Sequence, residues 1–391
     1  MRSSLAALLI ALAPMTAQAA VPCGGSFDEF IGRMKDEAVR QGHDRGVVER
    51  FFASAQFDPA VIRADRRQGI FQRPFTDFAR RLISEGRLVN GRRNGERWDA
   101  VFDRIEANWG VPREVILAFW AFETDYGAVQ GDFNTVNALL TLSHDCRRPD
   151  LFRPQVFSAI ELFENGDIDP ATTTGAWAGE IGMVQMLPGD IIENGVDGDG
   201  DGHVYLKTSA PDALMSGGKM LSSLGWRPNE PWLQEIVLPD QFDWAATGID
   251  KKRSVADWAA VGVRAREGAL GPANLPASIV IPEGRNGPAF IAYPNFDVYF
   301  EWNQSFTYVL TAAYFATRIA GAPVFDPRNP SPALTQDQMK ELQRKLAARG
   351  HDVGGIDGIL GAGTRGAVQA EQARLGMPAD AWPTVDLLGA L

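Results

Sequence analysis

The sequence is poor in cysteine and histidine, has no long basic run, and has no apolar run long enough to span a membrane. Its two cysteines, Cys23 and Cys146, are too widely spaced to suggest a zinc site. The formal net charge is −11, which argues against a nucleic-acid partner. We therefore expect neither a structural zinc, nor a transmembrane segment, nor a nucleic-acid surface.

The first 19 residues have the layout of a secretory signal peptide. Arg2 precedes an apolar run from Leu5 to Leu12, and the small-residue pattern Ala17-Gln18-Ala19 follows, so we expect cleavage after Ala19. The alternative is an amphipathic N-terminus. Lipid attachment at Cys23 is disfavoured by the preceding Pro22. Export would permit a disulfide between Cys23 and Cys146, the alternative being two unpaired thiols.

Residues 20–320 are predicted to form one large unit that is mainly α-helical, with a small β portion. Phe27, Phe30, Ile31 and Met34 recur at helical spacing. Short β-rich stretches follow late in the unit, which closes with a long helix. The stretches predicted as strands are 277–281 and 289–300, and the predicted closing helix is 305–320.

Residues 321–333 contain four prolines and little periodicity, a composition typical of a semi-rigid linker. The last unit, residues 334–391, is predicted to have three helices. Thr335 and Gln338 form a capping-box pattern at the start of the first helix, and Gly350 ends it. A glycine-rich turn precedes the second helix, which begins at Thr364.

A glutamate lies on the apolar face of a predicted helix that begins at Pro112 and ends at Gly127. Phe119 and Trp120 precede Glu123 by four and three residues and share its face. Apolar neighbours and the negative end of the helix dipole both disfavour a charged carboxylate, so they raise its pKa. A general acid needs this shift. The alternative is a structural glutamate satisfied by a backbone or arginine partner.

The string from Glu123 to Gly127 (ETDYG) resembles the catalytic motif of the membrane-bound lytic transglycosylase B family. Residues 177–188 (WAGEIGMVQMLP) resemble a second motif of that family, and residues 303–308 a third. The resemblance implies a lysozyme-like fold, Glu123 as the acid/base, and a groove for glycan strands. The substrate-binding residues that it implies are Tyr126, Trp177, Glu180, Gln185, Met186, Asn303, Ser305 and Tyr308. Trp302 is a further aromatic residue that could pack on a sugar.

The implied reaction is cleavage of the β-1,4 bond between N-acetylmuramic acid and N-acetylglucosamine in peptidoglycan, with formation of 1,6-anhydromuramyl ends. One carboxylate suffices for this route and no cofactor is needed. Two alternatives remain open. A hydrolytic muramidase would need a second carboxylate, for which Asp125 and Glu180 are candidates. A wall-binding scaffold would need no catalysis at all. For Glu180, which stands where some members have alanine, we expect a structural ion pair.

Residues 197–212 predict a calcium loop. Asp197, Asp199 and Asp201 occupy positions 1, 3 and 5, and His203 offers its carbonyl at position 7. Position 12 is a threonine, but the resemblance implies a longer loop whose last acidic ligand is Asp212. We expect one structural calcium ion, the alternative being an acidic turn without metal.

The C-terminal unit resembles the peptidoglycan-binding type 1 domain. The pattern DGxxGxxT is matched by Asp357, Gly358, Gly361 and Thr364. The resemblances together imply a periplasmic protein whose partner is the peptidoglycan strand, and we expect it to act as a monomer. The alternative for this unit is a small helical dimerisation domain.

Overall fold

The computed structural model describes residues 22–67 and 73–391. The predicted signal peptide, residues 1–19, lies outside the described residues. The chain is mainly helical with small antiparallel sheets, as predicted. Among the described residues, no helix combines the length and apolar character needed to cross a membrane.

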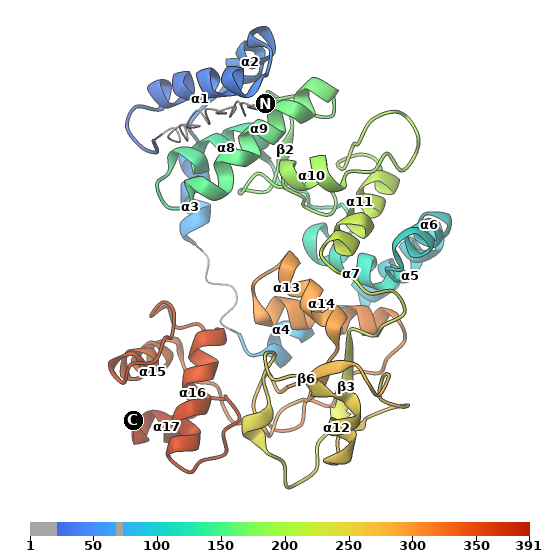
Figure 1. Ribbon diagram of the computed structural model, residues 1–391, viewed down its shortest axis with the longest axis vertical. Coiled ribbons are helices and arrows are strands. Elements are labelled where there is room, and N and C mark those ends of the chain that lie inside the picture. The colour runs from blue at the N-terminus through green and yellow to red at the C-terminus, as the bar shows by residue number, and fades with distance from the viewer. Residues whose placement is uncertain (1–21, 68–72) are drawn as a thin grey trace, which may run out of the picture.

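One helical layer packs around a core that includes Phe30 and Met34, both fully buried. These residues lie in a helix predicted from the apolar spacing, and the structure confirms it. This layer occupies the upper part of Figure 1. Its helices are α1 (Phe27–Gln41), α2 (Arg45–Phe51), α3 (Pro59–Arg66), α8 (Thr135–His144), α9 (Pro149–Asn165) and α10 (Pro188–Asn194), with the 3₁₀ turn η1 (Phe52–Ser54).

A second group of helices surrounds a separate apolar core. The predicted closing helix is confirmed as α14, and Ser305 caps its N-terminus by accepting a hydrogen bond from the Tyr308 amide. Met183 and Trp302 pack against both cores, so they mark the junction between the two. The helices of the second group are α4 (Phe75–Leu82), α5 (Glu85–Arg97), α6 (Asp99–Trp109), α7 (Arg113–Thr124), α11 (Ala210–Ser223), α13 (Pro294–Trp302) and α14 (Phe306–Ile319).

The β portion is a five-stranded antiparallel sheet in the order β4-β6-β7-β3-β5. Trp258, fully buried, lies in the core between this sheet and helix α12. The elements of this portion are β3 (Leu233–Val237), η3 (Trp244–Ala246), β4 (Arg253–Ser254), α12 (Val255–Ala260), β5 (Arg264–Ala265), β6 (Pro276–Val280) and β7 (Phe290–Ala292). A two-stranded ribbon pairs β1 (Phe133–Asn134) with β2 (Thr174–Gly175).

The strand predicted at 277–281 is confirmed as β6, but the one at 289–300 is wrong for most of its length. Only β7 is a strand, and helix α13 begins at Pro294. Proline cannot donate to a sheet ladder but is well suited to the first turn of a helix. The buried residues beyond it, Asn295, Phe296, Val298 and Tyr299, follow helical spacing.

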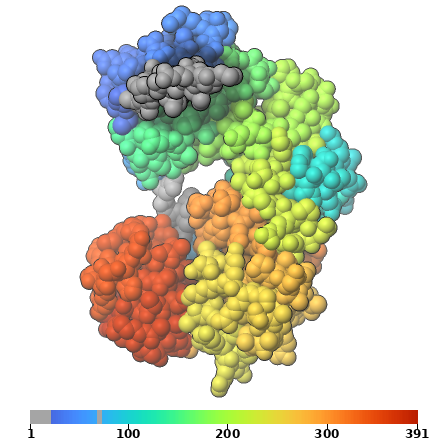
Figure 2. Space-filling model, viewed as in Figure 1, coloured from blue at the N-terminus to red at the C-terminus, as the bar shows by residue number. Residues whose placement is uncertain are grey.

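Three helices form the C-terminal module: α15 (Gln336–Ala348), α16 (Ala362–Arg374) and α17 (Val385–Ala390). The predicted capping box between Thr335 and Gln338 is present in full. Residues 321–333 carry no helix or strand, yet they pack on the larger unit, where Phe325 is buried in its core. Figure 2 shows the module, in red, lying directly against the β portion, in yellow.

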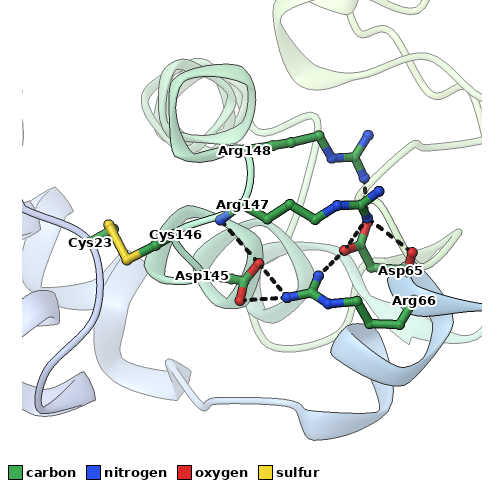
Figure 3. Close-up of polar contacts among 7 residues, drawn as sticks. All are labelled: Cys23, Asp65, Arg66, Asp145, Cys146, Arg147 and Arg148. Carbon is green, nitrogen blue, oxygen red and sulfur yellow. Dashed lines mark hydrogen bonds and ion pairs between the residues drawn. A yellow bond between two sulfur atoms is a disulfide. The ribbon is translucent and has the colours of Figure 1, made fainter. Parts of the chain in front are cut away.

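The predicted disulfide joins Cys23 to Cys146 and ties the segment before α1 to the connection between α8 and α9. Figure 3 shows the ion cluster beside it, in which Asp65, only 1% exposed, pairs with the guanidinium groups of Arg66, Arg147 and Arg148. Burial alone would raise the pKa of Asp65, but the hydrogen bonds from Arg147 and Arg148 outweigh it and lower the pKa. The cluster therefore fixes the end of α3 to this connection.

Candidate active site

Glu123 lies in the last turn of α7, close to the junction of the two helical cores. Two side chains donate hydrogen bonds to the same carboxylate oxygen, Oε1. The Tyr308 hydroxyl donates over 2.5 Å and the Trp302 indole N–H over 3.1 Å. Trp302 ends α13 and Tyr308 lies in the first turn of α14, so a short turn, residues 303–305, connects the two helices that carry the donors.

The surroundings of Glu123 raise its pKa to about 7. Burial is the largest cause, and the nearby Glu180 carboxylate adds to the rise. The hydrogen bonds from Tyr308 and Trp302 stabilise the charged form and act in the opposite direction. The direction agrees with the prediction from the apolar helix face. A carboxyl group with this pKa can give and take a proton near neutral pH.

Helix α7 ends at Thr124, earlier than the predicted Gly127. Asp125, Tyr126 and Gly127 all have positive φ, with values of 51°, 60° and 85°. Two of these are not glycine, and such backbone strain persists only where the surroundings enforce it. Arg87 supplies that restraint: its Nε donates to the Asp125 carboxylate over 3.0 Å, and its carbonyl accepts from the Tyr126 hydroxyl over 2.7 Å.

The loop of residues 176–187 is held against the end of α7. The Thr124 hydroxyl donates to the Met183 carbonyl over 2.6 Å, and the Gly127 amide donates back to that hydroxyl over 2.9 Å. The loop packs so closely that a Cβ on Gly182 would lie 2.4 Å from the Leu206 side chain. Only glycine fits there, which explains why the motif is glycine-rich.

The structure places the predicted loop residues in different surroundings. Gln185 is half-buried with a φ of 53°, and its amide donates to the Gly182 carbonyl over 2.7 Å. Trp177 is half-buried at the edge of one core. Met186 is 1% exposed and pairs through its backbone with Ile181. The Met186 side chain therefore packs in the core and holds the loop.

The predicted residues of the 303–305 turn support the donors of Glu123. Asn303 accepts a hydrogen bond from the Ser305 amide over 2.9 Å, and Ser305 caps α14. Tyr126, by contrast, packs edge-on against Trp120 and is half-buried. The residues that the structure brings directly to Glu123 are therefore Tyr308 and Trp302.

Glu180 does not form the ion pair we expected: no salt bridge involves it among residues 22–67 and 73–391. Its Oε2 atom is buried without a hydrogen-bond partner. Burial raises the pKa of Glu180, and backbone hydrogen bonding at Glu180 and Ala178, followed by the charge of Arg148, opposes this rise. Arg148 is instead held by Asp65. A buried carboxyl in this setting is costly to ionise.

The acidic loop brings together Asp197, Asp199 and Asp212, whose nearest carboxylate oxygens lie within 4.8 Å of one another. Asp212 is fully buried and accepts hydrogen bonds from the backbone amides of Gly198 and Tyr205, at 2.9 and 2.8 Å. Close carboxylate oxygens are the donor set that a hard divalent cation prefers.

Asp201 lies outside that group, whereas His203 was predicted to contribute its backbone carbonyl. Asp201 accepts a hydrogen bond from the His203 amide over 2.9 Å. The His203 imidazole lies 3.1 Å from the carboxylate of Asp167. This part of the chain therefore offers three clustered carboxylates where the loop pattern predicted four.

Three residues at the site have roles that their local sequence did not indicate. Trp302 was considered only as a sugar-stacking residue, whereas it hydrogen bonds to Glu123. Thr124 joins the end of α7 to the loop, and Arg87 restrains the turn after α7. The only local signal was that Thr124 belongs to the ETDYG string, because the other contacts cross long stretches of chain.

Comparison with protein families matches residues 26–317 to the transglycosylase SLT domain. Residues 335–391 match the family described as "Putative peptidoglycan binding domain". A curated relative, the membrane-bound lytic murein transglycosylase B of Escherichia coli (strain K12), is 24% identical over 321 residues. The match covers 77% of this chain and 86% of the relative.

Solved structures agree with this assignment. SltB3 from Pseudomonas aeruginosa, in complex with NAG-anhNAM-pentapeptide, has a TM-score of 0.86 and 34% identity, covering 94% of this chain and 99% of that one. The Escherichia coli lytic transglycosylase Slt35 in complex with calcium has the same fold, with a TM-score of 0.65 and 24% identity, covering 77% of this chain and 96% of that one. The chain belongs to the transglycosylase SLT domain family and is a peptidoglycan lytic transglycosylase with a C-terminal peptidoglycan-binding module.

Proposed function

We propose that Glu123 is the single acid/base of the reaction and that the products carry 1,6-anhydromuramyl ends. The observation that carries this proposal is a half-buried carboxyl whose pKa is raised to about 7 and whose Oε1 receives both hydrogen bonds. We assign the catalytic proton to the other oxygen, Oε2. A protonated carboxyl near neutral pH can act first as an acid and then as a base.

In the first step, Glu123 gives its proton to the glycosidic oxygen between N-acetylmuramic acid and N-acetylglucosamine, and the bond from that oxygen to C1 breaks. The muramyl N-acetyl group assists at C1, as in substrate-assisted glycosidases. In the second step, the Glu123 carboxylate takes the proton from the C6 hydroxyl, whose oxygen closes on C1. No water is consumed. Proximity of that hydroxyl to C1 lowers the activation barrier by up to about 7–11 kcal/mol.

The main alternative is hydrolysis of the same bond, which would need a second carboxylate to position water. Asp125 is poorly suited, because it is exposed and paired with Arg87. Glu180 is better placed to act on Glu123 electrostatically, but burial raises its own pKa and disfavours the charged base. These observations favour transglycosylation, as does the anhydro sugar bound to the related SltB3.

We further propose that one structural calcium ion binds to Asp197, Asp199 and Asp212. The clustered carboxylates support this, as does the calcium complex of the related Slt35. The ion would neutralise their repulsion and rigidify the loop that precedes α11. It would have no part in the chemistry, because a hard cation whose ligand positions are filled by carboxylates does not polarise the sugar bond.

The remaining proposals concern location and organisation. The disulfide supports an exported, periplasmic protein, as does a substrate that lies outside the cytoplasm. We propose that residues 20–320 form the catalytic unit, that 321–333 connect the two units, and that 334–391 bind the wall. A wall-binding module would raise the local concentration of glycan at the groove.

Digestion of purified sacculi, followed by mass spectrometry of the released fragments, tests the proposed reaction. The wild type should release fragments with anhydro ends, and E123Q should release none while keeping its melting temperature. E180Q is the matched control, since it removes the half-buried carboxylate that acts on Glu123. It should still yield anhydro ends. Reducing ends from the wild type, lost in E180Q, would favour hydrolysis and overturn the proposal.

A further inference from the structure

The C-terminal module is fastened to the catalytic unit and to the connecting segment by hydrogen bonds. The Gln369 side chain donates to the Thr247 carbonyl over 3.1 Å, and the Arg285 amide donates to the Asp380 carboxylate over 3.1 Å. The Trp382 indole donates to the Ser331 carbonyl over 2.9 Å. Gln369 and Asp380 are both buried, so the module has one fixed placement on the sheet side of the catalytic unit (Figure 1).

One residue of this interface contacts the helix that carries Tyr308. Arg365, on α16, donates to the Pro282 carbonyl over 2.8 Å, and its guanidinium lies 4.8 Å from the centre of the Phe306 ring. Burial lowers the pKa of Arg365 to about 10, and the charges of Glu283 and Asp380 oppose that loss. At neutral pH the group is a cation that is partly removed from water. In this setting a cation–π contact is at its strongest.

Phe306 is the first residue of α14, and it stacks on Phe300 of α13 at 6.4 Å with an interplanar angle of 25°. The two rings therefore clamp the turn of residues 303–305 from its two ends. Two residues beyond Phe300 lies Trp302, and two residues beyond Phe306 lies Tyr308. These are the two donors to the Glu123 carboxylate.

We propose that Arg365 is a positioning residue for Glu123: acting through Phe306, it holds the 303–305 turn so that Trp302 and Tyr308 keep their hydrogen bonds to the carboxylate. The module thus belongs to the catalytic machinery as well as to wall binding. This inference rests on the proposed role of Glu123. It requires that catalysis depend on the module even for a soluble substrate, to which wall binding contributes nothing.

The charged and titratable groups around the site allow the effect to be read from a pH profile. Glu123 is faced by Tyr308 from α14 and by Glu180 from the 176–187 loop, while Arg87 of α5 acts on Tyr308. Changing Arg365 removes none of these groups. Looser hydrogen bonds from Trp302 and Tyr308 would stabilise the Glu123 carboxylate less and raise its pKa. The reaction needs protonated Glu123, so kcat/KM falls at alkaline pH as this group loses its proton. That alkaline limb of the pH profile would then move to higher pH.

The experiment uses the full chain, a soluble tetrasaccharide of alternating N-acetylglucosamine and N-acetylmuramic acid, and the variants R365M and R365K. R365M should lower kcat roughly tenfold, because a small misplacement of a catalytic group is costly. It should also move the alkaline limb to higher pH by about half a pH unit, with KM nearly unchanged. R365K keeps the charge and should recover part of both effects. R344M, at an exposed position on α15, is the matched control and should behave as wild type.

R365M could act by detaching the module, so F306L serves as a second variant. F306L leaves the hydrogen bond from Arg365 to Pro282 intact. It should reproduce the limb shift, and the double variant should add little to either single one. The inference would be overturned if F306L and R365M both kept the kcat and the pH profile of the wild type. It would also be overturned if the only effect of R365M were a higher KM on intact sacculi. Cleavage by E123Q would instead overturn the proposed function and this inference together.

Discussion

Replacing Tyr308 by phenylalanine removes a donor to Glu123 without changing the ring that packs beside Phe122. A hydrogen bond to a charged group contributes about 1.5–3 kcal/mol, against roughly 1 kcal/mol for a neutral pair. The protonated form of Glu123 therefore loses less than the carboxylate does. The difference, ~1.4 kcal/mol, corresponds to about one pKa unit. The pKa of Glu123 should rise from about 7 by that amount.

The assay is kcat/KM for soluble glycan as a function of pH, because this quantity reports the free enzyme. Y308F should be slower overall, since Glu123 is less well oriented. Its rate relative to wild type should nevertheless rise about fivefold between about pH 6 and about pH 8, because more Glu123 stays protonated in the variant. A relative rate that is flat across this range would refute the assignment of the alkaline limb to Glu123. A fall would mean that Tyr308 raises the pKa of Glu123.

For three further variants the structure fixes the direction of the expected change. E180Q removes a carboxylate that raises the pKa of Glu123, so its alkaline limb should move to lower pH; a limb that stays in place would show that Glu180 is neutral there. C146S opens the bond to Cys23, which spans 123 residues, and should lower the free energy of unfolding by about 2–4 kcal/mol in urea titrations. An unchanged midpoint would contradict this. Millimolar calcium should raise the melting temperature of the wild type, and D212N should abolish that rise; a calcium response that survives the substitution would exclude this carboxylate as a ligand.

Local sequence patterns predicted the elements whose causes are themselves local. The apolar spacing around Phe30 predicted α1, and the Thr335–Gln338 pair predicted the cap of α15. The stretch after β7 was mistaken for a strand, because its apolar and aromatic content is typical of both structures. Pro294 was the missed signal. The helix end after Glu123 was placed too late because glycine is the usual left-handed cap, whereas here Asp125 takes that conformation under restraint from Arg87.

The sequence by itself determined that a glutamate sits on the apolar face at the end of a helix, and hence that its pKa is raised. Only the tertiary structure decided which groups set that pKa. Trp302 and Tyr308 are 179 and 185 residues away from Glu123 along the chain, and Glu180 acts from a separate loop. Periodicity reports the neighbours of a residue within one turn of helix, whereas hydrogen bonds and charges act through space. One segment of the sequence therefore indicated the acid/base group, whereas the groups that set its pKa come together only in the whole fold.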